Sequence, residues 1–514
     1  MKKTLSLVVI LFAALDASAQ GTFPKSLKED TNGYMSEAYW KQWNPKEQAR
    51  IDSDIEKYRK ADGTVTIADI AEGTDVKVEQ ISHDFIFGAH IFNYDQLGRT
   101  EYNDRYKALF GTLFNSATVA FYWKTFEMQP SRPRFREEYW DTERFWNGQA
   151  QPYYMPHWRR PSPERVVEFC KDRGIRTHGH VLIWGNRQWH HPEWLADCMT
   201  ASERAQWSRF TANPAGAVKT DRDKMTDEYA ATSVGELEKM FAHYADTLEY
   251  LYDKRIREVA EYYGGTIDSW DVVNESAGDD RRGLLVPDSK LCKSIYGIMP
   301  GDYPYKALKS AEKYFPSNVK LNINDYRRNR YYAEQVKGLL ARGCKIDIIG
   351  IQMHLFDPQE CIDIAEGHGK QTPEEVRGYL ECMSEADRPL HLSEITITSP
   401  GSDERGFMIQ AIITQNLYRL WFSCEKMMGI TWWNIVDNCG APGEPSISGL
   451  FTRDMQPKPA YYALENLINN EWKTRLTARP DKDGTIRFRG FKGNYRITWT
   501  DKHGNTQTKE YYLK

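Results

Sequence analysis

Two glutamates, each closing a short apolar run, are the residues in this sequence with the clearest chemical potential. Glu275 ends the segment Trp270–Glu275, and Glu394 ends the segment His391–Glu394 much further along the chain. If both segments are parallel strands of one barrel, both carboxyl groups point into the same mouth. A carboxyl group that holds a proton beside a second that stays ionised is the arrangement that hydrolyses a glycosidic bond. A lone glutamate at a strand end is as readily a capping or ion-paired residue, so the prediction depends on the two converging.

The elements that must position these glutamates are short β-rich runs that alternate with helical patterns. There are eight such runs: Phe85–Gly88, Ser116–Phe121, Ile175–Ile183, Ile267–Val273, Lys320–Ile323, Ile346–Ile351, Leu390–Ile395 and Gly429–Ile435. Helix signals lie between them, such as a start at Ser162-Pro163 and a stop at Gly174. The alternation predicts an α/β protein with a parallel sheet, and eight units match a (β/α)8 TIM barrel. An open, doubly wound sheet is the competing architecture.

Polar and aromatic residues lie at or just beyond the ends of seven of the runs. Active sites of such barrels form at the carboxyl ends of the strands, so these side chains are expected to line one mouth. They are Tyr122, Lys124, His178, His180, Asn274, Glu275, Asn324, Asp325, Gln352, His354, Glu394, Trp432 and Trp433.

The two ends of the 514-residue chain differ from its middle. Residues 1–19 are predicted to be a signal peptide, because two lysines precede an apolar stretch and a small-residue cleavage site. This predicts export to the periplasm or the medium, with no transmembrane segment in the mature chain. Residues 20–80 are expected to form a helical and β attachment, residues 81–470 the barrel, and residues 471–514 a small antiparallel β segment packed against it. The insertion Ala196–Val234 is left open as a lid or a rim loop.

Composition narrows the class of protein. Lys and Arg number 68 and Asp and Glu number 72, so the formal net charge is only −4. This excludes a strongly cationic nucleic-acid-binding protein. The 16 Trp and 30 Tyr suit a protein that stacks flat faces against rings. The eight cysteines form no CxxC pair, so most are predicted to be small buried hydrophobic residues, and one or two disulfides are left open.

Five motifs together resemble the glycoside hydrolases of family 10, the xylanase family, over roughly residues 81–470. The motifs stand in the order of that family: Gly179–Trp184, Trp270–Glu275, Asn324–Tyr326, Gly350–His354 and Gln456–Tyr462. The resemblance implies a retaining endo-β-1,4-glycanase, most simply a xylanase, that acts on a polysaccharide or oligosaccharide and needs no cofactor or metal. It makes Glu275 the acid/base and Glu394 the nucleophile, with carboxyl groups about 5 to 5.5 Å apart.

The same resemblance implies roles for seven further residues. Asn274 is expected to hydrogen-bond the sugar 2-hydroxyl, and His354 to orient Glu394. Gln352 lies on the same strand face as His354. The remaining four contact the sugar: His180 and Lys124 through hydroxyl groups, and Trp184 and Trp433 as walls of the subsite, although either tryptophan is also a plausible core residue.

The sequence departs from the family pattern at several of these positions. Phe121 and Tyr122 stand where the family has polar sugar contacts, and Gly185 stands where it has a histidine. Thr396 replaces an aspartate that normally helps to fix the histidine of the sixth strand, and a second tryptophan after Trp433 is missing. Decorated xylan or another β-linked glycan is therefore an open alternative to plain xylan.

Two other functions remain open on the sequence alone. A barrel that binds glycan without turnover is compatible with the altered surroundings of Glu394. His178 and His180 also share one strand face, as metal-binding histidines of some barrel hydrolases do. Such pairs usually lie on the first strand and need further ligands, whereas this pair lies on the third.

Overall fold

The computed structural model describes residues 23–136, 162–211, 225–441 and 443–514. The expected signal peptide, residues 1–19, lies outside the described residues. Within them, no helix combines the length and apolar character needed to cross a membrane. All eight cysteines are free, so the disulfides that the sequence left open do not form, and five of the eight side chains are buried.

Eight parallel strands close into a barrel. They are β3 (Ile86–His90), β4 (Ser116–Ala120), β5 (Arg176–His180), β7 (Ser269–Asn274), β10 (Lys320–Asp325), β11 (Ile348–Leu355), β12 (Leu390–Ile397) and β13 (Met427–Trp432). Each pairs in parallel with the next, and β13 pairs with β3 to complete the circle. The closure confirms the predicted TIM barrel and excludes the open sheet. A short strand, β6 (Ile183–Trp184), adds to β7 at its carboxyl end.

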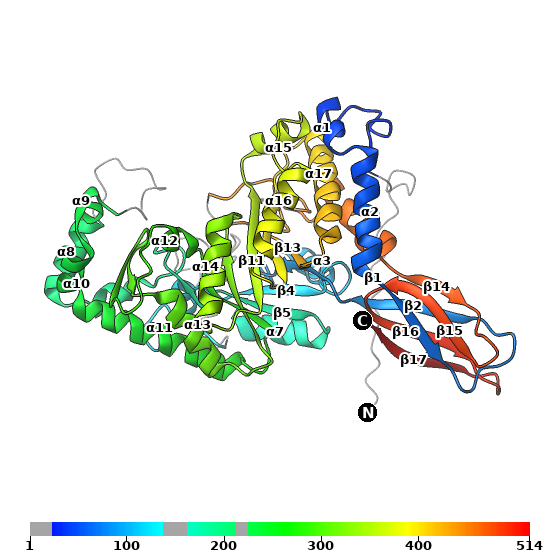
Figure 1. Cartoon of the computed structure of the whole chain (residues 1–514), viewed down its shortest axis with the longest axis horizontal. Coiled ribbons are helices and arrows are strands. Elements are labelled where there is room, and N and C mark those ends of the chain that lie inside the picture. The colour runs from blue at the N-terminus through cyan, green and yellow to red at the C-terminus, as the bar shows by residue number, and fades with distance from the viewer. Residues whose placement is uncertain (1–22, 137–161, 212–224, 442) are drawn as a thin grey trace.

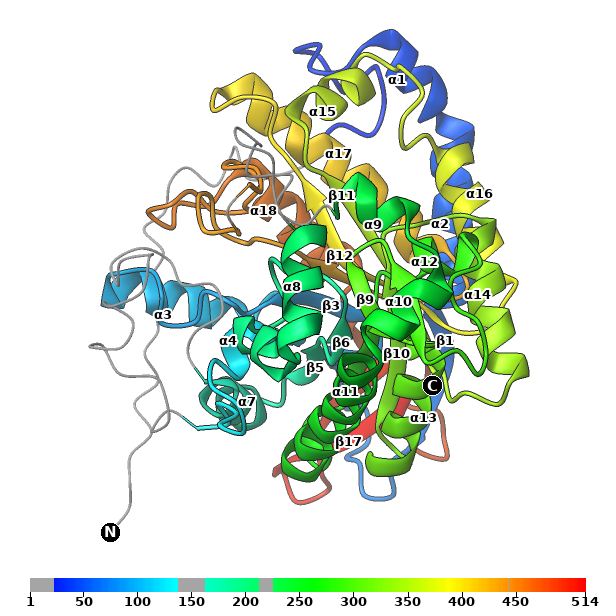
Figure 2. The same cartoon turned by 90° about the vertical axis from the view of Figure 1, so that its left-hand side faces the viewer.

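Helices surround the barrel strands (Figures 1 and 2). They are α3 (Thr100–Leu109), α4 (Trp123–Phe126), α7 (Pro163–Asp172), α11 (Ala242–Tyr263), α12 (Ala277–Arg281), α13 (Tyr303–Tyr314), α14 (Arg330–Ala341), α15 (Pro358–Ala365), α16 (Pro373–Ser384), α17 (Glu404–Ser423) and α18 (Pro459–Glu465). Capping side chains fix several starts: Asn329 accepts from the backbone of α14, and Thr372 from that of α16. α17 is buried along most of its length because α2, α15 and α18 cover it.

The insertion between β6 and β7 is helical where it is described. It carries a 3-10 helix (Glu193–Cys198), α8 (Ala201–Phe210), α9 (Asp227–Ala231) and α10 (Val234–Met240). Thr200 and Ser233 each form a capping box with the glutamate three residues on, which explains where α8 and α10 begin. A hairpin of β8 (Leu291–Ser294) and β9 (Gly297–Pro300) packs against α10 and α11, so the insertion and hairpin together extend one end of the barrel (Figure 1).

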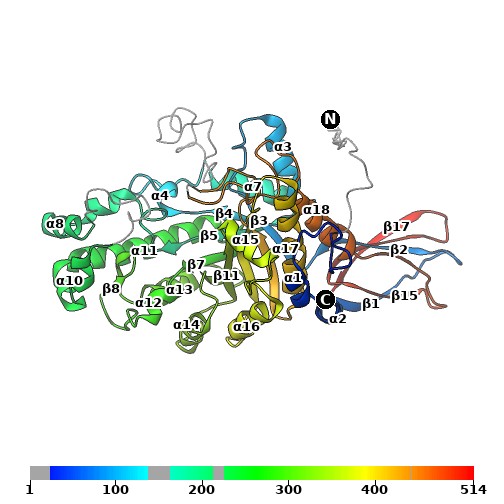
Figure 3. The ribbon, with the colours of Figure 1, turned by 90° about the horizontal axis from the view of Figure 1, so that it is seen from above.

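The two chain ends build one β unit at the opposite end of the molecule (Figure 3). β1 (Lys60–Thr66) pairs with β15 (Thr485–Phe491), and the second sheet runs in the order β14 (Arg475–Ala478), β2 (Val76–His83), β16 (Gly493–Thr500), β17 (Thr506–Leu513). All these pairings are antiparallel. From the sequence we predicted that residues 20–80 and residues 471–514 form separate attachments. The predicted boundary between residues 80 and 81 lies inside β2. The strands of the two attachments instead share one core.

Ring contacts and hydrogen bonds join this β unit and the N-terminal helices to the barrel. Phe491 belongs to the barrel's hydrophobic core and lies 6.1 Å from Phe422 of α17, measured between ring centroids. α1 (Glu37–Gln42) and α2 (Pro45–Arg59) reach α17 through hydrogen bonds that Asn416 makes with Tyr39 and Gln48, of 2.8 and 3.1 Å. The N-terminal attachment is therefore part of the barrel's outer packing.

Candidate active site

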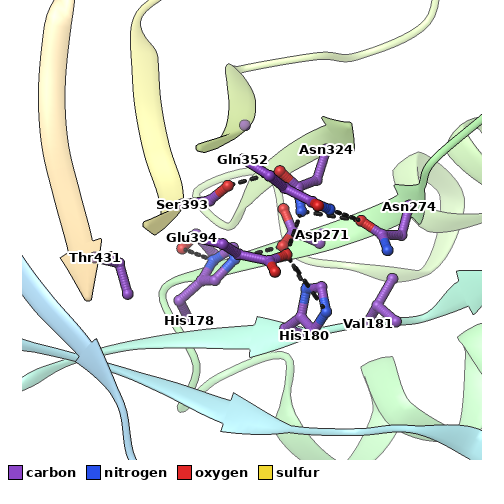
Figure 4. A network of polar contacts seen from close by, with 12 residues as sticks. His178, His180, Val181, Asp271, Asn274, Asn324, Gln352, Ser393, Glu394 and Thr431 are labelled. Atoms are coloured by element: carbon purple, nitrogen blue, oxygen red, sulfur yellow. Dashed lines mark hydrogen bonds and ion pairs between the residues drawn. The ribbon is translucent and has the colours of Figure 1, made fainter. Parts of the chain in front are cut away.

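The barrel register brings the polar ends of four strands to one mouth. In parallel pairing Asn324 of β10 lies beside Asn274 of β7, and Gln352 of β11 lies beside Glu394 of β12. Because alternate residues of a strand face opposite sides, these side chains point to the barrel axis together. Figure 4 shows them converging with His178, His180 and Asp271.

Glu394 is held by an amide and lies between two imidazoles. Asn324 Nδ2 donates to Glu394 Oε1 at 2.8 Å, and Ser393 Oγ donates to Asn324 Oδ1 at 2.6 Å, which fixes the orientation of that amide. His354 Nε2 lies 3.4 Å from Glu394 Oε2, and His180 Nε2 lies 3.8 Å from Glu394 Oε1. Only 6% of Glu394 is exposed. One amide donor and two imidazole rings therefore flank the two oxygens of this carboxylate.

Glu275 is held by a different set of donors. Tyr296 Oη and Trp184 Nε1 donate to Glu275 Oε2 at 2.8 and 3.1 Å, and Gln352 Nε2 donates to Glu275 Oε1 at 3.2 Å. Burial raises the pKa of Glu275; the hydrogen bond from Tyr296 lowers it and the charge of Glu394 raises it, and the balance is upward. Of the two carboxyl groups, Glu275 is thus the one favoured to hold a proton.

Three amide side chains connect the carboxyl groups. Asn274 Oδ1 accepts from Asn324 Nδ2 at 2.9 Å and from Gln352 Nε2 at 3.2 Å. A continuous set of hydrogen bonds therefore runs from Glu275 through Gln352, Asn274 and Asn324 to Glu394. Since its oxygen is committed, the amide nitrogen of Asn274 is the part of that side chain left to donate to a ligand.

His178 and His180 share a buried carboxylate. His178 Nε2 and His180 Nδ1 lie 2.9 and 2.8 Å from the same oxygen, Oδ2 of Asp271. Burial alone would raise the pKa of Asp271, but the charge and hydrogen bonds of the two histidines hold it well below its ordinary value. Burial would lower the pKa of His180, and the charges of Glu394 and Asp271 outweigh it, so this pKa is raised. Asp271 thus favours a positive imidazolium at His180, next to Glu394.

The contacts with Asp271 engage both histidines, His178 and His180, that were considered as metal ligands. Each turns a ring nitrogen to Asp271, and His178 Nδ1 also lies 2.8 Å from Ser269 Oγ. Across the described ranges, no three or more His, Cys, Asp or Glu side chains are grouped so as to hold a metal ion. The site is therefore organised by hydrogen bonds between organic side chains.

Aromatic side chains wall the mouth. Trp184, Trp433, Tyr122, Phe92 and Val181 form a separate buried cluster. The Trp433 ring stands edge-on to His180, with 5.6 Å between centroids, and is 4% exposed. Trp184 is 9% exposed and donates to Glu275. Both tryptophans are therefore buried against the polar network, as neighbours of the residues expected to act on substrate.

Two residues with predicted site roles, Lys124 and His354, have partners that the family pattern does not predict. Lys124, on α4, places its Nζ 3.3 Å from Glu193 Oε1 and is not brought into the network of carboxyl groups and amides. His354 Nδ1 lies 2.9 Å from Thr396 Oγ1, so the hydroxyl of the residue that replaces the family's aspartate holds this imidazole. The ring is still oriented toward Glu394, but by a neutral partner.

Sequence reasoning missed Tyr296 and gave no site role to Asn324. Tyr296 lies in the turn of the β8–β9 hairpin, and no local pattern shows that this turn folds back onto Glu275. Asn324 carried a signal, because it ends a strand in a recognisable motif, yet its contact with both Asn274 and Glu394 depends on the register of three strands.

Residues 78–467 match the family model described as Glycosyl hydrolase family 10, and the chain belongs to this family. It is thus a member of a family of retaining glycoside hydrolases, which confirms the resemblance of the five motifs.

Individual relatives are distant. The chain is 24% identical to the Anti-sigma-I factor RsgI6 of Acetivibrio thermocellus, over 65% of this chain and 34% of that protein. It is 26% identical to Endo-1,4-beta-xylanase B of Butyrivibrio fibrisolvens, over 58% of this chain and 41% of that protein. The chain therefore matches less than half the length of either relative. The crystal structure of native xylanase 10B from Thermotoga maritima is similar in fold, with a TM-score of 0.50, 19% identity and coverage of 76% of this chain and 96% of that one.

Proposed function

We propose that this chain is a retaining endo-β-1,4-glycanase that hydrolyses a xylan-type backbone. One observation carries the proposal: Glu275 and Glu394 belong to one hydrogen-bond network, and burial together with the charge of Glu394 raises the pKa of Glu275. Two carboxyl groups held in this way are what double displacement requires. The names of several relatives, including Endo-1,4-beta-xylanase B of Thermotoga neapolitana, support a xylan backbone.

In the first step Glu394 attacks the anomeric carbon while Glu275 protonates the leaving oxygen, and a covalent glycosyl-enzyme forms. In the second step Glu275, now ionised, takes a proton from water, which attacks the same carbon and releases Glu394. The hydrogen bonds from Tyr296 and Trp184 suit this exchange, because they stabilise Glu275 in its charged form between the two steps.

The surrounding side chains position the sugar. The amide nitrogen of Asn274 donates to the 2-hydroxyl, and this bond strengthens as the ring becomes oxocarbenium-like. His180, kept positive by Asp271, donates to a neighbouring hydroxyl and balances the charge of Glu394. Trp184 and Trp433 wall the subsite, and Lys124 reaches a hydroxyl only by leaving Glu193. We further propose export of the mature chain to the periplasm or medium.

Hydrolysis of a panel of plain, arabinose-bearing and glucuronate-bearing xylans, with sizing of the products, tests this function. We expect short oligosaccharides from at least one xylan, and loss of turnover in Glu394→Ala. Azide is expected to restore turnover of an aryl xyloside by that variant, since a small anion fits where the carboxylate was. Binding of xylan without any product from the wild type would instead favour a non-catalytic glycan-binding barrel, which the neutral partner of His354 and the engaged Lys124 make the second candidate.

A further inference from the structure

Two arginines shortly after β10 form no salt bridge through their guanidinium groups within the described part of the chain. Arg327 and Arg328 follow Asn324 and Asp325, and neither forms an ion pair with a carboxylate among the described residues. One guanidinium nitrogen of each, Nε of Arg327 and Nη1 of Arg328, is buried and has no hydrogen-bond partner within the same part of the chain. A buried charged donor left unpaired is costly, so such a pair of groups indicates a ligand.

Both arginines line one hollow of about 530 Å³ between the β10–α14 loop and α16. Figure 2 shows α14 and α16 side by side at this edge of the barrel, and the two helices are in contact. The hollow is lined by Tyr326, Arg327, Arg328, Glu375, Gly378 and Tyr379, among others. Glu375 is the one carboxylate in this lining, and its Oε2 already accepts from the backbone of Gln371 at 2.6 Å. The net charge of the lining is therefore positive.

One residue of the lining, Tyr326, is near Glu275, because the charge of Glu275 contributes to raising the pKa of this tyrosine after burial, which raises it most. Asp325 accepts from the backbone N–H of Arg327 at 2.8 Å and from that of Ala277 at 2.9 Å, which ties the loop to the segment immediately after Glu275. The position that a Cβ would take on Gly278 lies 3.7 Å from Arg327 Nε, so the guanidinium rests against the start of α12. The loop that lines the hollow is thus attached to the segment that follows Glu275, the residue proposed to protonate the leaving group.

Its lining combines flat rings with planar cations. Tyr326 is 44% exposed, and the guanidinium carbon of Arg327 lies 5.2 Å from the centre of its ring. Arg328 lies over the ring of Tyr379 at 5.0 Å. An exposed tyrosine face packs against a sugar ring, and a guanidinium fork matches a carboxylate in two parallel hydrogen bonds. A uronic acid presents both features in one residue.

We propose that Arg327 and Arg328 form a subsite for the carboxylate of a uronic acid substituent carried by the leaving-group part of the glycan. This inference rests on the proposed function for its direction along the substrate and deepens it by naming a substrate class. It makes the chain selective for glucuronate-bearing over neutral xylan.

The test compares glucuronoxylan with the same polymer after reduction of its carboxyl groups to alcohols. We expect the wild type to show a higher kcat/KM on the charged polymer. In the double variant Arg327→Ala/Arg328→Ala, the ratio of kcat/KM on the charged polymer to that on the reduced polymer should fall about three- to tenfold, since the ion pairs are partly solvated. Arg330→Ala is the control: it removes one positive charge from the first residue of α14, close to the two arginines in sequence, but Arg330 is exposed and paired with Glu334 at 2.6 Å. That variant should keep the wild-type ratio.

Calorimetry with a glucuronate-bearing xylo-oligosaccharide separates this inference from the proposed function. Binding that weakens in the double variant but not in Arg330→Ala supports the subsite even if no polymer is hydrolysed. Hydrolysis of both polymers with an unchanged ratio in the double variant overturns the subsite and leaves the glycanase intact. Equal loss on both polymers, with an unchanged melting temperature, also overturns it.

Discussion

Replacing Tyr296 by Phe removes the hydroxyl that donates to Glu275 and, with it, the hydrogen bond between Tyr296 and Trp184. The hydroxyl donates to Glu275 Oε2 at 2.8 Å, and this bond lowers the pKa of a group that burial has raised. A hydrogen bond to a charged group contributes about 1.5 to 3 kcal/mol, and a partly exposed site retains the lower part of that range. Because one pKa unit corresponds to about 1.4 kcal/mol, the pKa of Glu275 should rise by about one unit.

The assay is the pH dependence of kcat/KM on an aryl xylobioside. Glu275 must be protonated in the first step, so the alkaline limb of the profile reports its pKa in the free enzyme. The limb should move to higher pH by about one unit in Tyr296→Phe. Tyr250→Phe, at a residue that is 62% exposed on α11, controls for the loss of a tyrosine hydroxyl and should leave the limb in place. An alkaline limb that stays fixed or moves to lower pH in a folded Tyr296→Phe enzyme refutes the assignment of Glu275 as the proton donor.

Three further substitutions test the network and the barrel beneath it. Asn324→Ala removes the amide that donates to Glu394 at 2.8 Å, and it should lower kcat/KM on the same aryl substrate about tenfold or more. An unchanged kcat/KM would show that this hydrogen bond does not contribute to turnover. Asp271→Asn leaves two histidines without their carboxylate and should lower the free energy of unfolding by about 3 to 5 kcal/mol at pH 7, in urea titrations. Because the pKa of Asp271 is lowered in the folded protein, its contribution to the free energy of unfolding is fully present above about pH 4 and is lost as the pH falls further. The difference in the free energy of unfolding between wild type and Asp271→Asn should therefore shrink below that pH. A difference that stays constant would contradict the account. Gly179→Ala places a Cβ 2.3 Å from the Trp270 ring and should cost about 1 to 3 kcal/mol by thermal unfolding, whereas an unchanged melting temperature would mean that the strand shifts freely.

The barrel and the convergence at its mouth were open to prediction because both follow from strand periodicity. Each of the eight predicted runs overlaps an observed barrel strand, and closure follows once their number and direction are fixed. Asn274 ends β7, and Gln352 and Glu394 follow the apolar first halves of β11 and β12, so their positions depend only on knowing where an apolar run stops. Local pattern is sufficient for residues of this kind.

Other features depend on contacts between distant segments and carry no local signal. The strands β1 and β2 pair with β15 and β16, but alternation of polar and apolar residues does not identify a partner. Lys124 follows a predicted run, as expected. Its ion-pair partner, Glu193, belongs to the insertion between β6 and β7, whose helices we did not predict. The sequence shows that two arginines, Arg327 and Arg328, follow β10. Only the fold shows that their guanidinium groups form no salt bridge with a carboxylate among the described residues.

Covalent trapping tests the central claim most directly. A 2-deoxy-2-fluoro xylobioside with a good leaving group slows both steps and lets the glycosyl-enzyme accumulate. Peptide mapping by mass spectrometry should then place one added xylobiosyl group on Glu394. A label on any other residue, or turnover with no covalent species at all, would contradict the account.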